Sequence, residues 1–391
     1  MKGRNLSPGN SQQHKIPDLD IIDLEKENRS ASQASDSPSD PQSADSPPAS
    51  KEKDSAKAPN RRFRINVHMV LLAVAVLFVV GIVYKVKNFG VYVDLDEIFA
   101  DGPGEYDDSY DTILPLLDAS NNPVYKDYSQ GSTILAFGNA PFADDRGSED
   151  NLVNIMQQET GATIYNCSIS GSHLAAQLKK PDPEKAPWDV FNPYWLCNIA
   201  AKNEAAGEDY QQALKVLGSA APPEAREVYD ILQSIDFNTV DAIVLMYDAS
   251  DYLDGLPMFN PEDATDITTF TGTTEAVIEY MQFFFPNVRI IVLSPTYAFA
   301  LDDDGKYISS DMKRYGQDVL STYAILQYAS CVSRSVTFVD NIYNTFNEDN
   351  AKKYLSDHLH LNVKGRKKVA ERFAYALNYY NQNRSAEGEK D

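Results

Sequence analysis

Cysteine is scarce in this 391-residue chain, and its three cysteines are Cys167, Cys197 and Cys331. Their number is odd and their spacings match no metal-binding or redox motif, so a disulfide framework is excluded. One pair at most could form a disulfide bridge, and buried free thiols are the simpler interpretation.

Positive charge is scarce in the larger part of the chain. From Asn88 onward there are 22 Lys and Arg against 47 Asp and Glu, whereas residues 1–64 carry 11 against 10. A surface this acidic repels phosphate backbones, so we expect no nucleic acid partner. Such an acidic surface is typical of a domain in a salty or polyanionic exterior. It is equally explained by the need to keep the domain soluble.

Aromatic residues are scarce in residues 1–60, which are rich in Ser, Pro, Asp and Lys. Such a segment buries too little apolar surface to offset its ordering entropy, and we predict a disordered tail. An apolar run over residues 65–84 follows, with no charge from Met69 to Val83. At ~1.5 Å per residue it spans the ~30 Å hydrocarbon core, so we predict a transmembrane helix. A cleavable signal peptide is the weaker alternative, because the run starts far into the chain.

The charges that flank this run predict its orientation. Basic residues precede it: Lys51, Lys53, Lys57, Arg61, Arg62 and Arg64. The residues beyond Lys87 are acidic, so the positive-inside rule places the tail in the cytoplasm and the C-terminal part outside. We expect a single-pass plasma-membrane protein, and the few cysteines and short tail suggest a bacterium with one membrane. The sequence does not identify a partner for the tail.

Beyond a connector over residues 88–130, apolar strand patterns alternate with helical ones over residues 131–383, before a disordered end at 384–391. The predicted strands are Thr133–Phe137, Thr163–Asn166, Ala242–Met246, Arg289–Leu293 and Val336–Val339. Helices are predicted over Glu149–Thr160 with Ser148 as N-cap, in the region Ala200–Ser234, over Thr273–Phe285 and Ser310–Cys331, and from Val363 to about Tyr380. This alternation predicts an α/β fold, with a five-stranded parallel sheet covered by helices on both faces.

The most informative motif is the run Asp357-His358-Leu359-His360-Leu361-Asn362-Val363-Lys364-Gly365. An Asp three residues before a His can turn its carboxylate onto the imidazole Nδ1–H. This contact fixes the tautomer and leaves Nε2 free to act as a base. Asp357 and His360 are therefore candidate catalytic residues.

Polar and small residues follow the predicted strands, at the edge of the sheet where ligands bind in α/β folds. These segments are Gly138-Asn139-Ala140, Asn166-Cys167-Ser168-Ile169-Ser170-Gly171-Ser172, Asp248-Ala249-Ser250-Asp251 and Ser294-Pro295. With the Asp357–His360 block, their order and spacing resemble the SGNH/GDSL hydrolases over roughly Thr133 to Tyr380. The resemblance implies a flavodoxin-like three-layer sandwich and an ester-hydrolase type of site, with no cofactor.

In that family a Gly-Asp-Ser turn after the first strand supplies the nucleophile. A Gly after the second strand and the Asn of a Gly-x-Asn-Asp block after the third build the oxyanion hole, and this third block corresponds here to Asp248-Ala249-Ser250-Asp251. This chain has Ala140 at the serine position, and a methyl group cannot attack an ester. The resemblance places Gly138, Asn139, Gly171, Ser250 and Asp251 at oxyanion or ligand positions. Asp248 would bring a negative charge near an oxyanion, and loss of one oxyanion donor alone costs about a hundredfold in rate or more. The ordinary mechanism is therefore not available.

A displaced serine is the alternative nucleophile, with Ser168, Ser170 or Ser172 reaching a histidine base. Beyond the apolar run the only histidines are His173, His358 and His360. A cation site among Asp144, Asp145, Asp248, Asp251, Asp357 and His360 is conceivable, but solvated acidic loops are the stronger interpretation and we expect no metal. Trp188, Tyr194 and Trp195 accompany a proline-rich insertion (Pro181 to Pro193), where they could form platforms for sugar rings or pack a lid onto the sheet.

Three functional hypotheses follow. The first is a membrane-anchored extracytoplasmic domain that lacks the usual nucleophile and binds, or helps to acylate or deacylate, a cell-envelope glycan. The second is an active acyl-ester hydrolase or transferase that uses His360, Asp357 and a relocated serine, Ser170 or Ser172. The third is a non-catalytic envelope scaffold whose tail signals inside the cell.

Overall fold

Five short apolar segments form one parallel sheet in the computed structural model, which describes residues 110–118, 120, 122–128, 131–343 and 345–388. The strands are β3 (Thr133–Gly138), β4 (Thr163–Asn166), β5 (Ala242–Met246), β6 (Arg289–Leu293) and β9 (Thr337–Val339). Their order is β4-β3-β5-β6-β9, with parallel pairing throughout. This is the strand order of a flavodoxin-like doubly wound sheet, and the predicted α/β fold with five parallel strands is confirmed.

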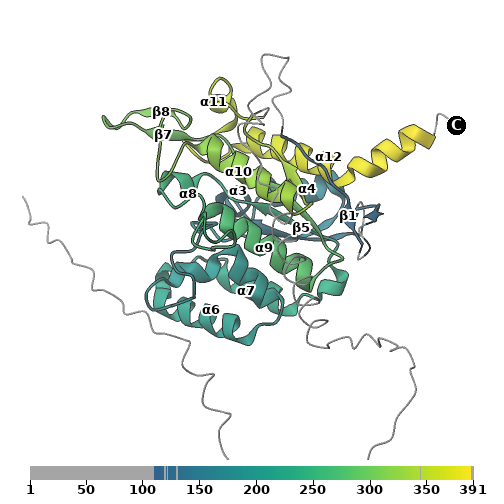
Figure 1. Ribbon diagram of the computed structural model, residues 1–391, viewed down its shortest axis with the longest axis horizontal. Helices are drawn as coiled ribbons and strands as arrows, with labels where there is room; N and C mark the ends of the chain where they lie inside the picture. The colour runs from purple at the N-terminus through teal and green to yellow at the C-terminus, as the bar shows by residue number, and fades with distance from the viewer. Residues whose placement is uncertain (1–109, 119, 121, 129–130, 344, 389–391) are drawn as a thin grey trace, which may run out of the picture. The chain divides into compact units, whose positions relative to one another are not determined.

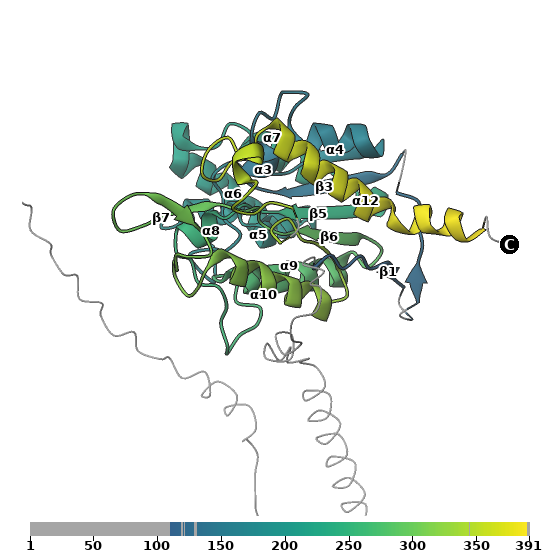
Figure 2. The same cartoon turned by 90° about the horizontal axis from the view of Figure 1, so that it is seen from above.

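The three inner strands β3, β5 and β6 send alternate side chains into two separate apolar layers. Leu135, Ile243 and Val292 pack on one face with helices α5 (Pro193–Ala200), α6 (Glu204–Leu217), α7 (Ala225–Ser234), α9 (Phe270–Phe284) and α10 (Leu320–Ser333). Ile134, Val244 and Ile291 pack on the other with α4 (Leu152–Thr160) and α12 (Val363–Gly388). Figure 2 shows α4 and α12 on one side of the sheet and α9 and α10 on the other. Burial of both faces explains the continuous apolar runs of β5 and β6.

The helices differ from the sequence prediction in several places, and α12 continues to Gly388, through most of the end predicted as disordered (384–391). The predicted N-cap Ser148 is wrong: Asn151 caps α4 by accepting hydrogen bonds from the backbone N–H of Val153 and Asn154. The helix predicted from Ser310 begins only at Leu320, because the residues before it form strand β8 (Tyr307–Ser309) and a turn. The Ala200–Ser234 region contains α6 and α7, joined by a short 3-10 turn at Gly218–Ala220.

Several short elements were not predicted. The two-residue strands β1 (Leu116–Leu117) and β2 (Pro123–Val124) pair with each other, and Thr112 forms an antiparallel bridge with Phe338 at the β9 edge of the sheet. Strands β7 (Phe299–Leu301) and β8 form a hairpin that projects from the main body (Figure 1). Short helices α3 (Ala140–Ala143), α8 (Ser250–Leu253), α11 (Ala351–Tyr354) and the 3-10 helices Pro187–Phe191 and Phe237–Thr239 complete the described elements.

The predicted transmembrane helix at residues 65–84 lies outside the described residues, as do the tail and most of the connector. Within the described ranges, no helix has the length and apolar character needed to span a bilayer. The three cysteines are free and buried.

Gly138 at the end of β3 pairs with Met246 at the end of β5 and leaves no room for a side chain. A Cβ built on Gly138 would lie 2.1 Å from the carbonyl oxygen of Met246, so even one methyl group would force the ends of β3 and β5 apart. We expect Gly138→Ala to lower the free energy of unfolding by about 1–3 kcal/mol, as overpacking does, in chemical denaturation followed by circular dichroism. Gly147→Ala is the control, because nothing lies within 4 Å of its built Cβ, and equal stability of the two variants would contradict this packing.

Candidate functional site

Asp357 organises the turn that carries His360. Its Oδ1 accepts hydrogen bonds from the backbone N–H of Leu359 (2.8 Å) and His360 (2.7 Å), and its Oδ2 lies 2.7 Å from His360 Nδ1. One carboxylate therefore fixes both the backbone and the ring. Nε2 of His360 makes no hydrogen bond with any residue that the structure describes, so this nitrogen is free for a ligand.

The residues after His360 anchor this turn to the domain. Asn362 Oδ1 accepts hydrogen bonds from the backbone N–H of Lys364 and Gly365 and so caps α12. A Cβ on Gly365 would lie 2.4 Å from the Tyr354 carbonyl oxygen, so only glycine fits there. The Leu-Asn-x-x-Gly part of the motif thus positions His360 and takes no part in the site itself.

Carboxylates set the charge state of His360. Partial burial lowers its pKa, but the hydrogen bond to Asp357 and the negative charges of Asp357, Asp144 and Asp248 outweigh burial, and the net pKa of His360 is raised. Burial raises the pKa of the Asp144 carboxyl, against the opposing charges of His360 and Arg366. The charges of three acidic side chains therefore favour the imidazolium form of His360.

The nucleophile position lies at the end of β3. Gly138 ends the strand, Asn139 follows, and Ala140 begins α3. Asn139 and Ala140 are both buried. At the two positions where the SGNH/GDSL pattern has an aspartate and a serine, this chain has the buried amide of Asn139 and the methyl group of Ala140.

Asn139 and Asp248 form a reciprocal pair between the ends of β3 and β5. Asn139 Nδ2 donates to Asp248 Oδ1 (2.8 Å), and the backbone N–H of Asp248 donates to Asn139 Oδ1 (2.9 Å). Asn139 Nδ2 also donates to the carbonyl oxygen of Ser172 (3.0 Å). The sequence analysis did not predict this pair. A signal for it exists, because Asn139 and Asp248 both depart from the family pattern and both follow strands that are neighbours in the sheet.

The same carboxylate occupies the donors of Ser250. Asp248 Oδ1 accepts from Ser250 N (2.9 Å) and Ser250 Oγ (2.5 Å). Ser250 is the residue expected to stand in for the oxyanion-hole asparagine. In this structure both of its hydrogen-bond donors point to Asp248, so neither is available to an oxyanion.

Asp251 holds a loop and does not face a ligand. It is fully buried, and its carboxylate accepts from the backbone N–H of Leu174 (2.9 Å) and Ala175 (2.7 Å). Burial raises its pKa to about 6. This contact fixes the residues that follow Gly171, itself exposed and in the left-handed conformation with φ 75°.

The three serines proposed as a displaced nucleophile lie in different surroundings. Ser168 and Ser172 are buried, and their hydroxyls donate to Asn166 Oδ1 (2.5 Å) and the Ile169 carbonyl oxygen (2.8 Å). Ser170 is exposed, and its backbone N–H donates to Glu224 (2.6 Å). In the described part of the chain, no serine hydroxyl hydrogen bonds with the imidazole of His360.

The other two histidines have separate roles. His173 Nε2 lies 2.7 Å from Asp254 Oδ2. The His358 ring stacks on Tyr307 of the β7–β8 hairpin (5.2 Å between ring centroids), and its carbonyl oxygen accepts from Phe299 N (2.8 Å). The hairpin therefore packs directly against the turn that holds His360.

The remaining expectations concern metal ligands and Ser294. Among the residues that the structure describes, no three His, Cys, Asp or Glu side chains group as metal ligands. Asp145 forms an ion pair with Arg366 of α12 (2.7 Å). Ser294 is buried and hydrogen bonds with Pro295 O and Asn341 N.

Comparisons with known proteins give only weak likenesses. No protein-family model and no curated protein matches the chain. Solved structures that match include a protein from Lactobacillus plantarum (17% identity, TM-score 0.43, 64% of this chain and 98% of that one). Others are a possible lipase from Chitinophaga pinensis (14%, 0.40, 64% and 98%) and a carbohydrate acetylesterase from Sinorhizobium meliloti (12%, 0.37, 64% and 99%). At these identities and scores they carry no conclusion about activity.

The charge on His360 is testable by titration. We expect Asp357→Asn to lower the pKa of His360, because the variant loses a negative charge and a charge-assisted hydrogen bond, and nuclear magnetic resonance of the ring protons measures this shift. The raised pKa means that the pair contributes stability at pH below about 6.5, which is lost as the pH rises through the folded-state pKa. The difference in free energy of unfolding between the parent chain and Asp357→Asn should therefore shrink as the pH rises from about 6.5 through the folded-state pKa of His360. Glu208→Gln, an exposed change on α6, is the control, and an unchanged His360 pKa in Asp357→Asn would contradict the assignment.

Proposed function

We propose that this chain is a single-pass plasma-membrane protein with an extracytoplasmic domain of the SGNH-hydrolase type. The domain binds a cell-envelope glycan or its acyl substituents without the serine-based ester hydrolysis of that family. The observation that carries the proposal is the strand-end arrangement, where Ala140 replaces the nucleophile and Asp248 takes up both donors of Ser250. The proposed membrane anchor and cytoplasmic tail depend on sequence features outside the described residues.

The chemistry of the strand-end site suits a hydroxylated ligand. Carboxylates accept charge-assisted hydrogen bonds from hydroxyl groups, and Asp144 and Asp248 act on the same imidazole. A protonated His360 donates from Nε2 to a carbonyl or hydroxyl oxygen, which are the oxygens that an acylated sugar presents. The deprotonated ring could accept a proton from a ligand hydroxyl, which is how the site would assist an acyl transfer.

The alternative is an active acyl-ester hydrolase or transferase that uses a relocated serine. Ser170 is the best candidate for a relocated nucleophile, because its side chain is exposed and makes no hydrogen bond to a described residue. His360 would then have to reach this serine within ~3 Å in the working enzyme.

Labelling of the purified full chain with a fluorophosphonate separates these two functions. We expect no serine adduct by peptide mass spectrometry, because Ser168 and Ser172 are buried and tied and position 140 carries a methyl group. A variant that combines Asn139→Asp, Ala140→Ser, Asp248→Gly and Ser250→Asn is the positive control, and should be labelled at position 140. An adduct on Ser170 or Ser172 of the parent chain that disappears in His360→Ala would overturn the non-hydrolytic proposal.

Binding of an acylated glycan tests the ligand directly. We expect the full chain to bind O-acetylated xylan more tightly than the same polymer after mild alkaline deacetylation, as measured by isothermal titration calorimetry. His360→Ala should weaken binding about tenfold or more, which corresponds to one charge-assisted hydrogen bond. His173→Ala is the matched control, since that ring pairs with Asp254. Equal binding by the parent and His360→Ala would favour the non-catalytic scaffold and contradict a role for this site.

A further inference from the structure

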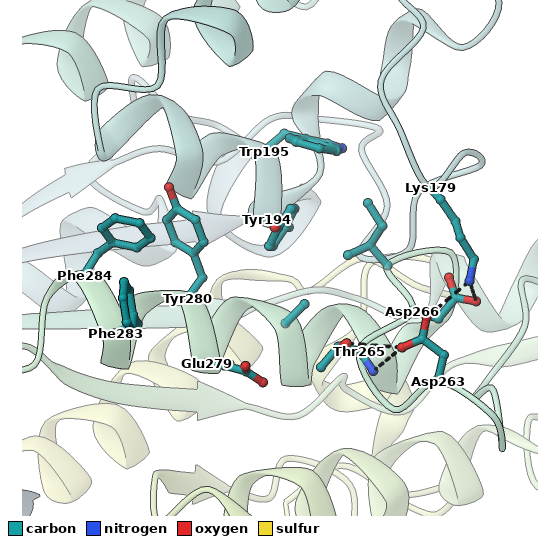
Figure 3. A pocket seen from close by; sticks show the side chains of 12 residues that line it. Lys179, Tyr194, Trp195, Asp263, Thr265, Asp266, Glu279, Tyr280, Phe283 and Phe284 are labelled. Atoms are coloured by element: carbon teal, nitrogen blue, oxygen red, sulfur yellow. Dashed lines mark hydrogen bonds and ion pairs between the residues drawn. The ribbon is translucent and has the colours of Figure 1, made fainter. Parts of the chain in front are cut away.

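A cavity of about 430 Å³ opens between α5, α9 and the loop before α9, and it shares no residue with the site around His360. Figure 3 shows its side chains, with the aromatic rings and Glu279 toward one end and Lys179, Asp263 and Asp266 at the other. The lining residues are Lys179, Tyr194, Trp195, Asp263, Thr265, Asp266, Ile267, Ala276, Glu279, Tyr280, Phe283 and Phe284. The volume lies within the ~300–1,000 Å³ range of small-molecule sites.

The aromatic end is a continuous row of five rings. Their successive centroids are 5.0 Å apart for Trp195 and Tyr194, 5.6 Å for Tyr194 and Tyr280, 4.5 Å for Tyr280 and Phe284, and 5.0 Å for Phe284 and Phe283. Phe283 and Phe284 are 78% and 51% exposed, the two largest apolar side chains of α9 left open to solvent. Exposed apolar rings gathered beside a cavity are typical of a binding or interaction site.

The cavity lining carries an excess of negative charge. Lys179 Nζ lies 2.9 Å from Asp266 Oδ2 and 3.2 Å from Asp263 Oδ2, so one ammonium group serves two carboxylates. Glu279 Oε2 lies 3.0 Å from Arg334 Nη2, and Arg334 also pairs with Glu275. The lining therefore disfavours a ligand with a net negative charge.

Hydrogen-bonding groups remain alongside these ion pairs. Burial raises the pKa of Tyr280 to about 12, so its phenol stays protonated and can donate. Asp266 is saturated by Asn260, Thr268 and Lys179. The partly exposed Asp263 keeps one acceptor site beyond its contacts with Thr265 and Lys179, since an ionised carboxylate has about four. The cavity thus pairs flat apolar surfaces with a polar rim.

We propose that this cavity binds an uncharged sugar ring. A pyranose has an apolar face of C–H groups, which packs on aromatic rings, and a rim of hydroxyls, which bonds to carboxylates and ammonium groups. An apolar peptide or a lipid would leave the Lys179–Asp266 end desolvated and unmatched. This site is independent of the proposed function, because none of its residues contacts Asp357 or His360.

Tryptophan fluorescence provides the test, because the chain has only two tryptophans. Trp188 lies outside the cavity lining, with its ring against Phe191, so Trp188→Phe leaves Trp195 as a reporter inside the cavity. We expect cellotriose or maltotriose to produce a saturable change in its emission. Phe283→Ala and Tyr280→Ala should each weaken the affinity about tenfold through loss of ring contact.

The controls separate binding from misfolding and from the other site. Tyr375→Ala removes a half-exposed tyrosine of α12, outside the cavity, and should keep the parent affinity, as should His360→Ala. Phe283 is so exposed that its variant is expected to fold normally, which circular dichroism checks. No saturable change with either trisaccharide would overturn the proposal, as would an affinity that neither cavity variant alters. Concentration-dependent dimerisation in sedimentation velocity that Phe283→Ala abolishes would also overturn it, by assigning these rings to an interface between two copies.

Discussion

The side chains of Asn139 and Asp248 join the carboxyl ends of the two central strands, and the character of the strand-end site depends on this contact. Two buried hydrogen bonds of 2.8 and 2.9 Å link residues 109 positions apart. In a buried setting such bonds are strong and their loss leaves polar groups unsatisfied, so neither residue can change alone without penalty. The Asp248 carboxylate also accepts hydrogen bonds from Ser250 N and Ser250 Oγ. These two donors are therefore not available to stabilise an oxyanion.

The position of the negative charge distinguishes this site from the hydrolase pattern that the sequence resembles. There the acidic residue follows the first strand and a glycine follows the third, whereas here Asn139 and Asp248 hold these positions. The charge has in effect moved to the neighbouring strand end, where it acts on His360 together with Asp144. The three carboxylates raise the pKa of His360 and so favour its imidazolium form, which donates a hydrogen bond from Nε2.

The sequence was sufficient where a structural feature is local. All five strands were predicted because buried parallel strands are apolar runs, and the Asp357–His360 contact was predicted because it spans three residues. Helix starts were less predictable, since both Ser148 and Asn151 are good caps and only the folded loop selects Asn151. The Asn139–Asp248 pair and the cavity beside α9 both depend on which segments meet in space. Lys179 and Asp266 are 87 positions apart, and no periodicity in the sequence brings them together.

The two polar sites of the domain differ in a way that bears on the size of their ligand. The strand-end site offers the free Nε2 of His360, so it would contact the hydroxyl or acyl edge of a sugar. The cavity beside α9 offers a row of aromatic faces, so it would contact the ring itself. If both proposals hold, a polysaccharide that reaches both sites would form its second contact at the effective concentration set by the first, so that two weak contacts would add to a stronger one.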